Sequence, residues 1–560
     1  MKATKMRKIM KTGFALAPMI AMAFLLTATA FAAAPGITGN TATGSTSTFN
    51  LTAQPAYISQ PDGQAVYSWG YGCVGGSTPT FAPAVFNAAP VGSPAGTPKI
   101  GFCSTMQVPG PTLIVTEGQT VTVTLTNNLP NSAGNTSILF PGFHLTSTTG
   151  GVAGLLTQEA APGSSVTYSF VASTPGTRAY YSGTQGDLQV EMGLYGAIIV
   201  LPAAVPANCT AAGSLAAKNR AAEVANGETD FRLAASAYDH PGTCYDREYM
   251  FQFSEMDPNI HHQADLQVQS KNGCGVGSVG CSLEVPTEPY HPAYFMINGR
   301  SMPDDMDPSY AAQYPHQPYN GNPHMHPGEQ VLVRIIGQGR WQHPFHEHGN
   351  HVRVLARDGN LILANSNITY NTGLTASGAA LAGPLLFTTT TTPGLAMDGI
   401  FYWTGRGLNW DPYGHHPGST DPLATLTCTP DANGYNTGDP TAINYYEWCQ
   451  DHNKPVQVNP FGDVANGGPV TLPDPNIFTN GPWYGGSPYL GPDATVRATG
   501  PTGSTPPSGT IANSPGGEAG FAFMWHSHNE REITTNNIFP GGMLMMMLVD
   551  SREFIIDETL

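Results

Sequence analysis

Two segments far apart in the chain each carry a pair of histidines separated by one residue. His346 and His348 lie in the run HPFHEHG, which begins at His343, and His526 and His528 lie in the run WHSH. Side chains two residues apart on a β-strand point to the same face, so each pair can aim at one point. Four imidazoles from two neighbouring strands form a site for copper, zinc, iron or nickel. One pair alone would be interpreted as surface or capping histidines, but two pairs in apolar, strand-like surroundings favour a metal site.

The sequence around these pairs resembles that of multicopper oxidases. The run HPFHEHGNHVRVL is similar to the family's H-P-x-H-L-H-G segment, and WHSH with a later GGM is similar to its H-C-H segment with a following methionine. Residues 109–130, PGPTLIVTEGQTVTVTLTNNLP, resemble the family's first-domain signature, as do residues 175–177 and 193–196. The resemblance covers residues 51–550 with gaps, and it implies cupredoxin-like domains with copper as the cofactor.

The blue type 1 copper of that family is held by a cysteine thiolate, two histidines and usually a weak axial group. The resemblance places His343 at one histidine position, Ser527 at the cysteine position and Glu532 at the second histidine position. A serine hydroxyl does not ionise near neutral pH and offers no soft sulfur donor. An insertion at 533–540 also displaces Met543 from the family's spacing. The resemblance therefore implies that the blue copper site has been lost.

The family's three-copper cluster is also incomplete in this sequence. Its four first-domain ligand positions are occupied here by Leu139, Pro141, Tyr181 and Gly183. Only Tyr181 can coordinate a metal, and a buried tyrosine is more often packed and hydrogen-bonded. The ligands that remain are His346, His348, His526 and His528. Four imidazoles can hold one ion, so we expect a mononuclear centre for copper or another transition metal, with water at an open position and His343 as a further candidate ligand.

Other residues with ligand chemistry rank lower. The pair His324 and His326 precedes a strand, and alone it favours a loop or edge position. We expect surface roles for His261-His262 and His415-His416. We expect Glu530 and Glu532 to orient a ligand histidine by hydrogen bonding, and Glu347 to lie behind the ligands or in solvent. Residues 543–547 are rich in methionine, which favours a buried strand over a copper(I) thioether site.

Composition predicts an all-β chain of several parts. The 560 residues include 65 Gly and 49 Pro, and only 11% are charged, with short apolar runs between turn residues. We predict two cupredoxin-like Greek-key β-sandwich domains. Their expected ranges are 51–202 and 294–550, separated by a linking region at 203–293 in which 211–225 form a short helix. Residues 33–50 form a flexible leader, 405–518 a long loop insertion and 551–560 a tail.

The N-terminus is typical of an export signal. A basic start, an apolar stretch at 14–26 and a small-residue site at 30–32 predict a signal peptide at 1–32, favoured over an uncleaved membrane anchor. The net charge of −17 becomes −22 when the five basic residues of that segment are removed, which disfavours nucleic acid and anionic membranes as partners. Eight cysteines in an exported chain predict disulfides. Proximity pairs Cys73 with Cys103, Cys209 with Cys244, Cys274 with Cys281, and Cys428 with Cys449.

Two functions remain open. The first is an exported, periplasmic or extracellular oxidoreductase that oxidises a small molecule or a metal ion directly at the four-histidine centre, without a blue copper. The second is a non-catalytic metal-binding or structural protein on a degenerate oxidase scaffold. Two-domain relatives often form trimers with sites between subunits, so the resemblance also implies a homotrimer.

Overall fold

The computed structural model describes residues 34–39, 44–90, 93–94, 96–225, 227–364, 380–403, 427–432, 436, 449, 486–489, 520–550 and 556. The predicted signal peptide, most of the predicted insertion, His415-His416 and nearly all of the predicted tail lie outside these residues.

Two five-stranded sheets form the first β-sandwich. One has the order β11-β12-β5-β1-β4 and the other β3-β2-β6-β10-β7. The bounds in the first sheet are β1 (Gly36–Thr38), β4 (Thr80–Ala82), β5 (Leu113–Thr116), β11 (Gly176–Tyr181) and β12 (Tyr195–Leu201). Those in the second are β2 (Thr46–Ser59), β3 (Ala65–Cys73), β6 (Thr120–Asn127), β7 (Leu145–Gly150) and β10 (Ser165–Val171), and β8 (Val152–Ala153) pairs with β9 (Gln158–Glu159). In β6, valine and leucine alternate with threonine, so one side of the strand enters the core.

The second β-sandwich consists of a seven-stranded and a six-stranded sheet. The seven-stranded sheet has the order β14-β13-β16-β22-β18-β19, with β20 on β18, and the six-stranded sheet has the order β15-β25-β24-β17-β21, with β23 on β24. The bounds are β13 (Arg247–Met256), β14 (Tyr294–Ile297), β16 (Gln330–Gly337), β18 (Val352–Arg357), β19 (Asn360–Leu361), β20 (Leu385–Leu386) and β22 (Ala396–Tyr402) for the first. They are β15 (His324–Met325), β17 (His343–Glu347), β21 (Thr388–Thr391), β23 (Gly486–Tyr489), β24 (Gly520–Ser527) and β25 (Leu544–Asp550) for the second. The predicted all-β fold of two cupredoxin-like sandwiches is confirmed.

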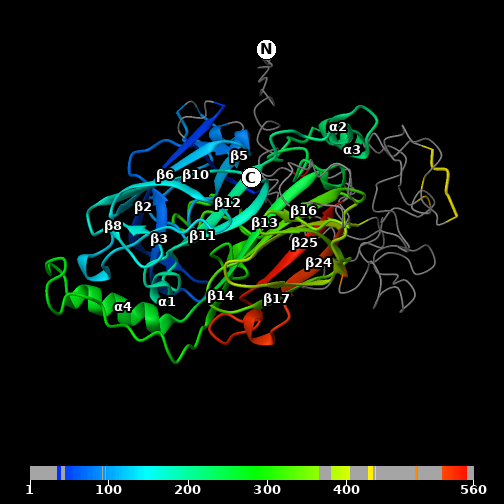
Figure 1. Ribbon diagram of the computed structural model, residues 1–560. Helices are drawn as coiled ribbons and strands as arrows, with labels where there is room; N and C mark the ends of the chain where they lie inside the picture. The colour runs from blue at the N-terminus through cyan, green and yellow to red at the C-terminus, as the bar shows by residue number, and fades with distance from the viewer. Residues whose placement is uncertain are drawn as a thin grey trace, which may run out of the picture.

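The first sandwich packs on the outer face of the seven-stranded sheet. Ala179, Ala197 and Ile199 of β11 and β12 form one buried cluster with residues of β13, β16 and β22, among them Met250 and Ile336. The seven-stranded sheet therefore lies between the first sandwich and the six-stranded sheet that carries β17 and β24 (Figure 1). The outer face of the six-stranded sheet thus points away from the first sandwich.

Helices are short and lie mainly between the sandwiches in sequence. They are α1 (Gly186–Gln189), α2 (Ala207–Thr210), α3 (Leu215–Ala225) and α4 (Pro258–Ser270), with 3-10 turns η1 (Ala84–Asn87), η2 (Asn131–Ala133), η3 (Pro241–Thr243), η4 (Asp304–Met306) and η8 (Glu530–Ile533). Helix α3 agrees with the predicted short helix, whereas α4 was not predicted. Its start is set by Asp257, whose side chain accepts the Asn259 N–H at 2.9 Å, and by proline at the first helical position.

Two further predictions can be compared with the structure directly. The four cysteine pairs are all disulfide-bonded as proximity predicted. Part of the predicted flexible leader is instead ordered in the sheets, because β1 and the start of β2 contribute buried side chains such as Ile37 and Phe49 to the first core.

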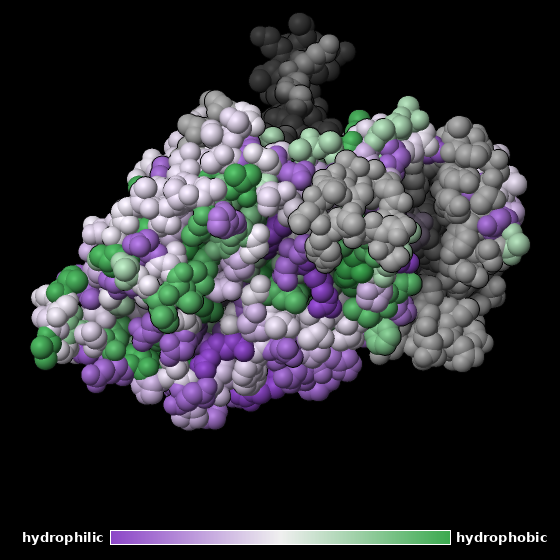
Figure 2. Space-filling view, in the orientation of Figure 1, coloured by the Kyte–Doolittle hydropathy of each residue, from purple (hydrophilic) through white to green (hydrophobic). Residues whose placement is uncertain are grey.

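No helix in the described part of the chain is long and apolar enough to cross a membrane. Figure 2 shows small, scattered groups of apolar residues on one face and hydrophilic residues gathered along its lower edge, below β14 and β17. Scattered apolar groups occur on most folded proteins and mark no particular site.

Candidate metal centre

The two histidine pairs lie on neighbouring antiparallel strands. The register pairs His346 of β17 with His526 of β24, and Glu347 with Trp525. Phe345 and Trp525 are fully buried in the core of the second sandwich. Alternation along each strand therefore turns the histidines to the outer face of the six-stranded sheet.

The turn after β17 places His348 beside the other rings. Gly349 follows with a φ of 99°, and a Cβ at this position would lie 2.9 Å from a ring carbon of Phe523. Glycine is the residue that accepts both this backbone conformation and this close approach. The indole N–H of Trp525 donates to the His348 carbonyl at 2.9 Å and fixes the turn.

The structure brings the four predicted rings together. The ring centroids of His346 and His348 are 4.6 Å apart, those of His346 and His528 5.1 Å, and those of His348 and His526 5.1 Å. The remaining close pairs, His526 with His528 and His346 with His526, are at 5.5 and 5.6 Å. His346, His348 and His526 are buried, while half of the His528 side chain is exposed. The cluster is thus enclosed on one side and open to solvent at His528.

Hydrogen bonds orient two of the rings. The Nδ1–H of His526 donates to the Ser527 carbonyl at 2.7 Å, which leaves the lone pair on Nε2. That Nε2 lies 3.2 Å from Nε2 of His348. Two ligands at about 2.0–2.1 Å from a tetrahedral ion are about 3.3 Å apart, so this separation suits a shared ion. Nδ1 of His346 is 2.8 Å from the Thr388 hydroxyl, and this contact holds its ring in place.

Burial keeps these rings neutral. Burial, followed by the nearby His526 and His528, lowers the pKa of His346 to about 4. Burial also lowers the pKa of His526 below its usual value. Neutral imidazole is the form that binds a metal, so the ligand form prevails at neutral pH without deprotonation on binding.

The nitrogens are not yet arranged around a single point. Among the described residues, no group of three or more histidine, cysteine, aspartate or glutamate side chains is already disposed as a metal site. The ring spacings and the paired Nε2 atoms nevertheless place the donors close to one another, and holding a side chain about 30° off its rotamer to complete the set costs only about 1 kcal/mol. A structural transition-metal site contributes about 10 kcal/mol or more, so the residues present fit a metal ion.

The position that the resemblance assigns to the blue copper holds an ion-pair cluster. The fully buried His343 places Nε2 3.0 Å from Glu255 Oε2 and Nδ1 2.9 Å from Glu532 Oε2. Burial opposes a charge on this ring, but the two hydrogen-bonded carboxylates outweigh it and raise the pKa of His343 to about 9. An imidazolium that donates both N–H groups has no lone pair for a metal. We therefore leave His343 out of the proposed ligand set.

Serine at position 527 belongs to the same cluster. Its hydroxyl donates to Glu532 Oε2, and the Asn529 side-chain amide donates to Glu532 Oε1 at 2.8 Å. Glu532 thus anchors His343 and β24 rather than a ligand histidine. Glu530, which is exposed, lies 3.5 Å from Nδ1 of His528 and is the carboxylate placed to orient that ring.

Two buried carboxylates have roles that the sequence did not reveal. Glu255, in β13, accepts the backbone N–H groups of Arg340 and Trp341 at 2.7 and 2.8 Å in addition to facing His343. Glu347 is buried rather than solvated; burial raises its pKa to about 8, and it accepts the Thr389 hydroxyl at 2.5 Å. Their partners are distant in sequence, so no local pattern could have indicated them.

The first-domain positions take no part in the cluster. Leu139 and Tyr181 face each other across a backbone bridge in the first sandwich, with the Leu139 N–H donating at 2.8 Å. A Cβ at Gly183 would meet the Leu139 side chain, so these positions pack against one another. Burial raises the pKa of Tyr181, which keeps it a neutral phenol.

Three of the lower-ranked histidines are buried. His324 lies on the edge strand β15 of the six-stranded sheet and His326 directly follows that strand, but their rings lie 2.6 Å from Asp550 and from Glu228 respectively. His261 is buried because α4 packs on β3, where its Nδ1 lies 2.6 Å from the Tyr67 carbonyl. The predicted surface role of His261 is therefore wrong, whereas its neighbour His262 is exposed.

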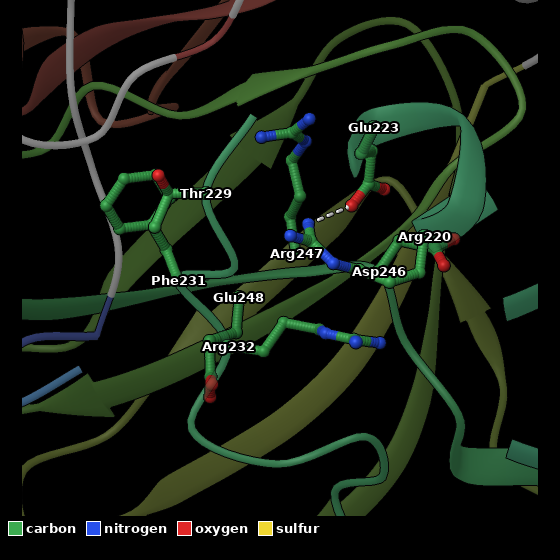
Figure 3. A pocket seen from close by; sticks show the side chains of 8 residues that line it. All are labelled: Arg220, Glu223, Thr229, Phe231, Arg232, Asp246, Arg247 and Glu248. Carbon is green, nitrogen blue, oxygen red and sulfur yellow. Dashed lines mark hydrogen bonds and ion pairs between the residues drawn. The ribbon is translucent and has the colours of Figure 1, made fainter. Parts of the chain in front are cut away.

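A small cavity in the linking region is lined mainly by charged residues (Figure 3). None of the four histidines lines it. Its lining is Arg220, Glu223, Thr229, Phe231, Arg232, Asp246, Arg247 and Glu248. Arg247 pairs with Glu228 at 2.5 Å and with Glu329 at 2.6 Å. These ion pairs join the linking region to the second sandwich.

Comparison with known proteins relates part of the chain to one family. Residues 93–204 match the family model described as multicopper oxidase. Laccase abr2 of Aspergillus fumigatus is 36% identical over 113 residues, which are 20% of this chain and 18% of that protein. Dihydrogeodin oxidase of Aspergillus terreus is 36% identical over 110 residues, 19% of this chain and 18% of that protein. The chain thus matches about a fifth of the length of these curated relatives.

Solved structures align over more of the chain at lower identity. The alignment with the multicopper oxidase mgLAC covers 90% of this chain and 86% of the mgLAC chain. Its TM-score is 0.42 and the sequence identity is 16%. A blue copper oxidase from Nitrosomonas europaea covers 89% and 85%, with a TM-score of 0.39 and 14% identity. The match of residues 93–204 and the likeness to the two Aspergillus oxidases identify this part of the chain as similar to multicopper oxidases.

Proposed function

We propose that this chain is an exported protein that binds one copper ion, or another transition metal, through His346, His348, His526 and His528. In this proposal it acts as an oxidoreductase without a blue copper. The observation that carries the proposal is the close grouping of the four rings, with the two Nε2 atoms of His348 and His526 at 3.2 Å.

The residues around the centre would each have a defined task. The bound ion supplies one-electron redox chemistry and Lewis acidity. The Ser527 carbonyl and the Thr388 hydroxyl hold the rings of His526 and His346 in their ligand orientations. The side of the cluster at the half-exposed His528 is open to solvent, and a small molecule or a metal ion would reach the centre from that side.

Oxidation would take place at this centre directly. With serine at position 527 and an imidazolium at His343, the chain lacks the thiolate and one histidine that a blue copper requires. The purified, copper-loaded protein should therefore show no intense absorption in the red from copper–thiolate charge transfer.

A non-catalytic metal-binding or structural role is the second candidate. The observation that favours it is the replacement of all four first-domain ligands by residues that pack against one another, as Leu139 and Gly183 do. Oxygen uptake with phenols, Fe(II) or Mn(II) separates the two candidates, because only the oxidoreductase consumes oxygen with one of these substrates.

Metal analysis of protein purified from its own host tests the centre itself. We expect about one bound ion per chain and its loss in the His346→Ala, His526→Ala double variant. The exposed His262 provides the matched control, since His262→Ala should retain the ion. Full metal content in the double variant would falsify the four-histidine centre.

Export and assembly complete the proposal. Four disulfides and the acidic composition support a chain that works outside the reducing cytosol, without nucleic acid as a partner. The homotrimer implied by the resemblance stays a prediction, which light scattering on the purified protein tests.

A further inference from the structure

The methionines of the last two strands divide into two groups by the face on which they lie. Met545 and Met547 of β25, together with Met543 just before that strand, are fully buried in the core of the second sandwich, as a buried strand requires. Met546 of β25 and Met524 of β24 lie on the opposite face and are half-buried. The core packing that accounts for the first group therefore does not account for the second.

Met524 and Met546 are direct partners across the two strands. Directly paired side chains have Cβ atoms about 4.5–5.5 Å apart. Two methionine side chains at that spacing can bring both sulfurs to one point, because each has three rotatable bonds. A pair of uncharged thioethers is a soft donor set, which selects Cu(I) over hard divalent ions.

The methionine pair adjoins the four-histidine centre. Met524 precedes His526 by two residues, so both side chains point from the same face of β24. His348 follows the last paired residue of β17, and its ring centroid lies 5.1 Å from that of His526, which is two residues from Met524. The imidazole pair His346–His526 and the thioether pair Met524–Met546 thus lie at neighbouring positions along the same face of β24.

We propose that Met524 and Met546 form a binding site for a soft monovalent cation, Cu(I), next to the histidine cluster. The pair would receive copper in the reduced state and hold it within reach of His348 and His526. Binding of Cu(I) by the methionine pair does not depend on the proposed four-histidine centre. The role of the pair as an entry point for copper does rest on that centre.

The test uses the full chain and Ag(I), a redox-inert ion with the ligand preferences of Cu(I). Binding is followed by titration calorimetry and by the methionine methyl resonances in a 13C-methyl-labelled sample. In the Met524→Leu, Met546→Leu variant we expect Ag(I) affinity to fall by about tenfold or more, with the fold retained because the exchange conserves volume. Met545→Leu, Met547→Leu is the matched control on the core face and should bind as the parent does.

Two results with the methionine variants overturn the proposal, and a third comes from a histidine variant. One is unchanged Ag(I) affinity in Met524→Leu, Met546→Leu, and the other is an equal loss in the core-face control. The His346→Ala, His526→Ala variant separates this site from the histidine centre. Retained Ag(I) binding in that variant places the ion on the methionines, whereas complete loss there assigns the ion to the histidines and rejects the methionine site while leaving the histidine centre intact.

Discussion

Both ring nitrogens of His343 face a carboxylate in the interior of the second sandwich. The Glu255–His343–Glu532 cluster occupies the position that the resemblance assigns to the blue copper, so a proton-bearing ring stands where the family holds a metal. Removing one partner from a buried ion pair costs about 3–5 kcal/mol, because the remaining charge is left without compensation. The cluster should therefore be a strong determinant of stability.

Stability should fall on the alkaline side because of this cluster. The folded pKa of His343, about 9, lies above its unfolded value of 6.5, so the contribution is complete below pH 6.5 and is lost as pH rises through 9. A shift of this size corresponds to about 3 kcal/mol. Urea unfolding followed by tryptophan fluorescence should show a large loss between pH 6 and 10 in the parent and a small one in Glu532→Gln. The exposed Glu530→Gln is the control and should follow the parent.

Restoring sulfur alone should not restore the blue site. In Ser527→Cys the thiol would lie beside Glu532, and the neighbouring His343 would still donate both N–H groups to carboxylates. We expect copper-loaded Ser527→Cys to remain without the red charge-transfer band. Appearance of that band in the single variant would show that copper displaces Glu255 and Glu532 from His343.

At the scale of the strands, the alternation of side chains along β17 and β24 determines where the four histidines lie. Alternation in both strands sends Phe345 and Trp525 into the core and the histidines outward. This could be predicted from the sequence, because a two-residue period is local information. The partners of Glu255 and His261 could not, because they come from segments brought together only by the fold. The same holds for α4, whose packing on β3 outweighs its weak sequence pattern.

The turn at Gly349 should be sensitive to a single methyl group. Gly349→Ala places a Cβ against the Phe523 ring, whereas Gly118, with a φ of 84°, has nothing within 4 Å of its Cβ position. Gly118→Ala therefore reports backbone strain alone. We expect Gly349→Ala to lower the free energy of unfolding by about 1–3 kcal/mol more than Gly118→Ala does. It should also weaken metal binding, because His348 moves with the turn; equal effects of the two variants on both measurements would contradict this.

At the scale of the whole molecule, an ion-pair network holds the linking region on the second sandwich. Arg247 and His326 both contact Glu228, and Ile556 near the C-terminus donates to it as well. Burial opposes ionisation of Glu228, but His326 and Arg247 outweigh it and lower the pKa of Glu228 to about 2. This carboxylate therefore stabilises the fold above its unfolded pKa of about 4.5 and loses that effect as pH falls through 2.

Glu228→Gln should destabilise the chain by about 3–5 kcal/mol at neutral pH. It should also flatten the decline in thermal stability between pH 5 and 2 relative to the parent. Glu288, which is largely exposed beside Arg340, supplies the control Glu288→Gln, for which little change is expected. Thermal unfolding by circular dichroism across this pH range measures both variants.

The first sandwich and the histidines occupy opposite outer faces of the second sandwich. A chain therefore cannot close its own centre with the surface that bears Leu139 and Tyr181; that surface would have to arrive from a neighbouring copy. Since that surface would bring packing groups rather than nitrogen donors, a neighbouring copy seated over the proposed centre would leave the number of ions bound per subunit unchanged.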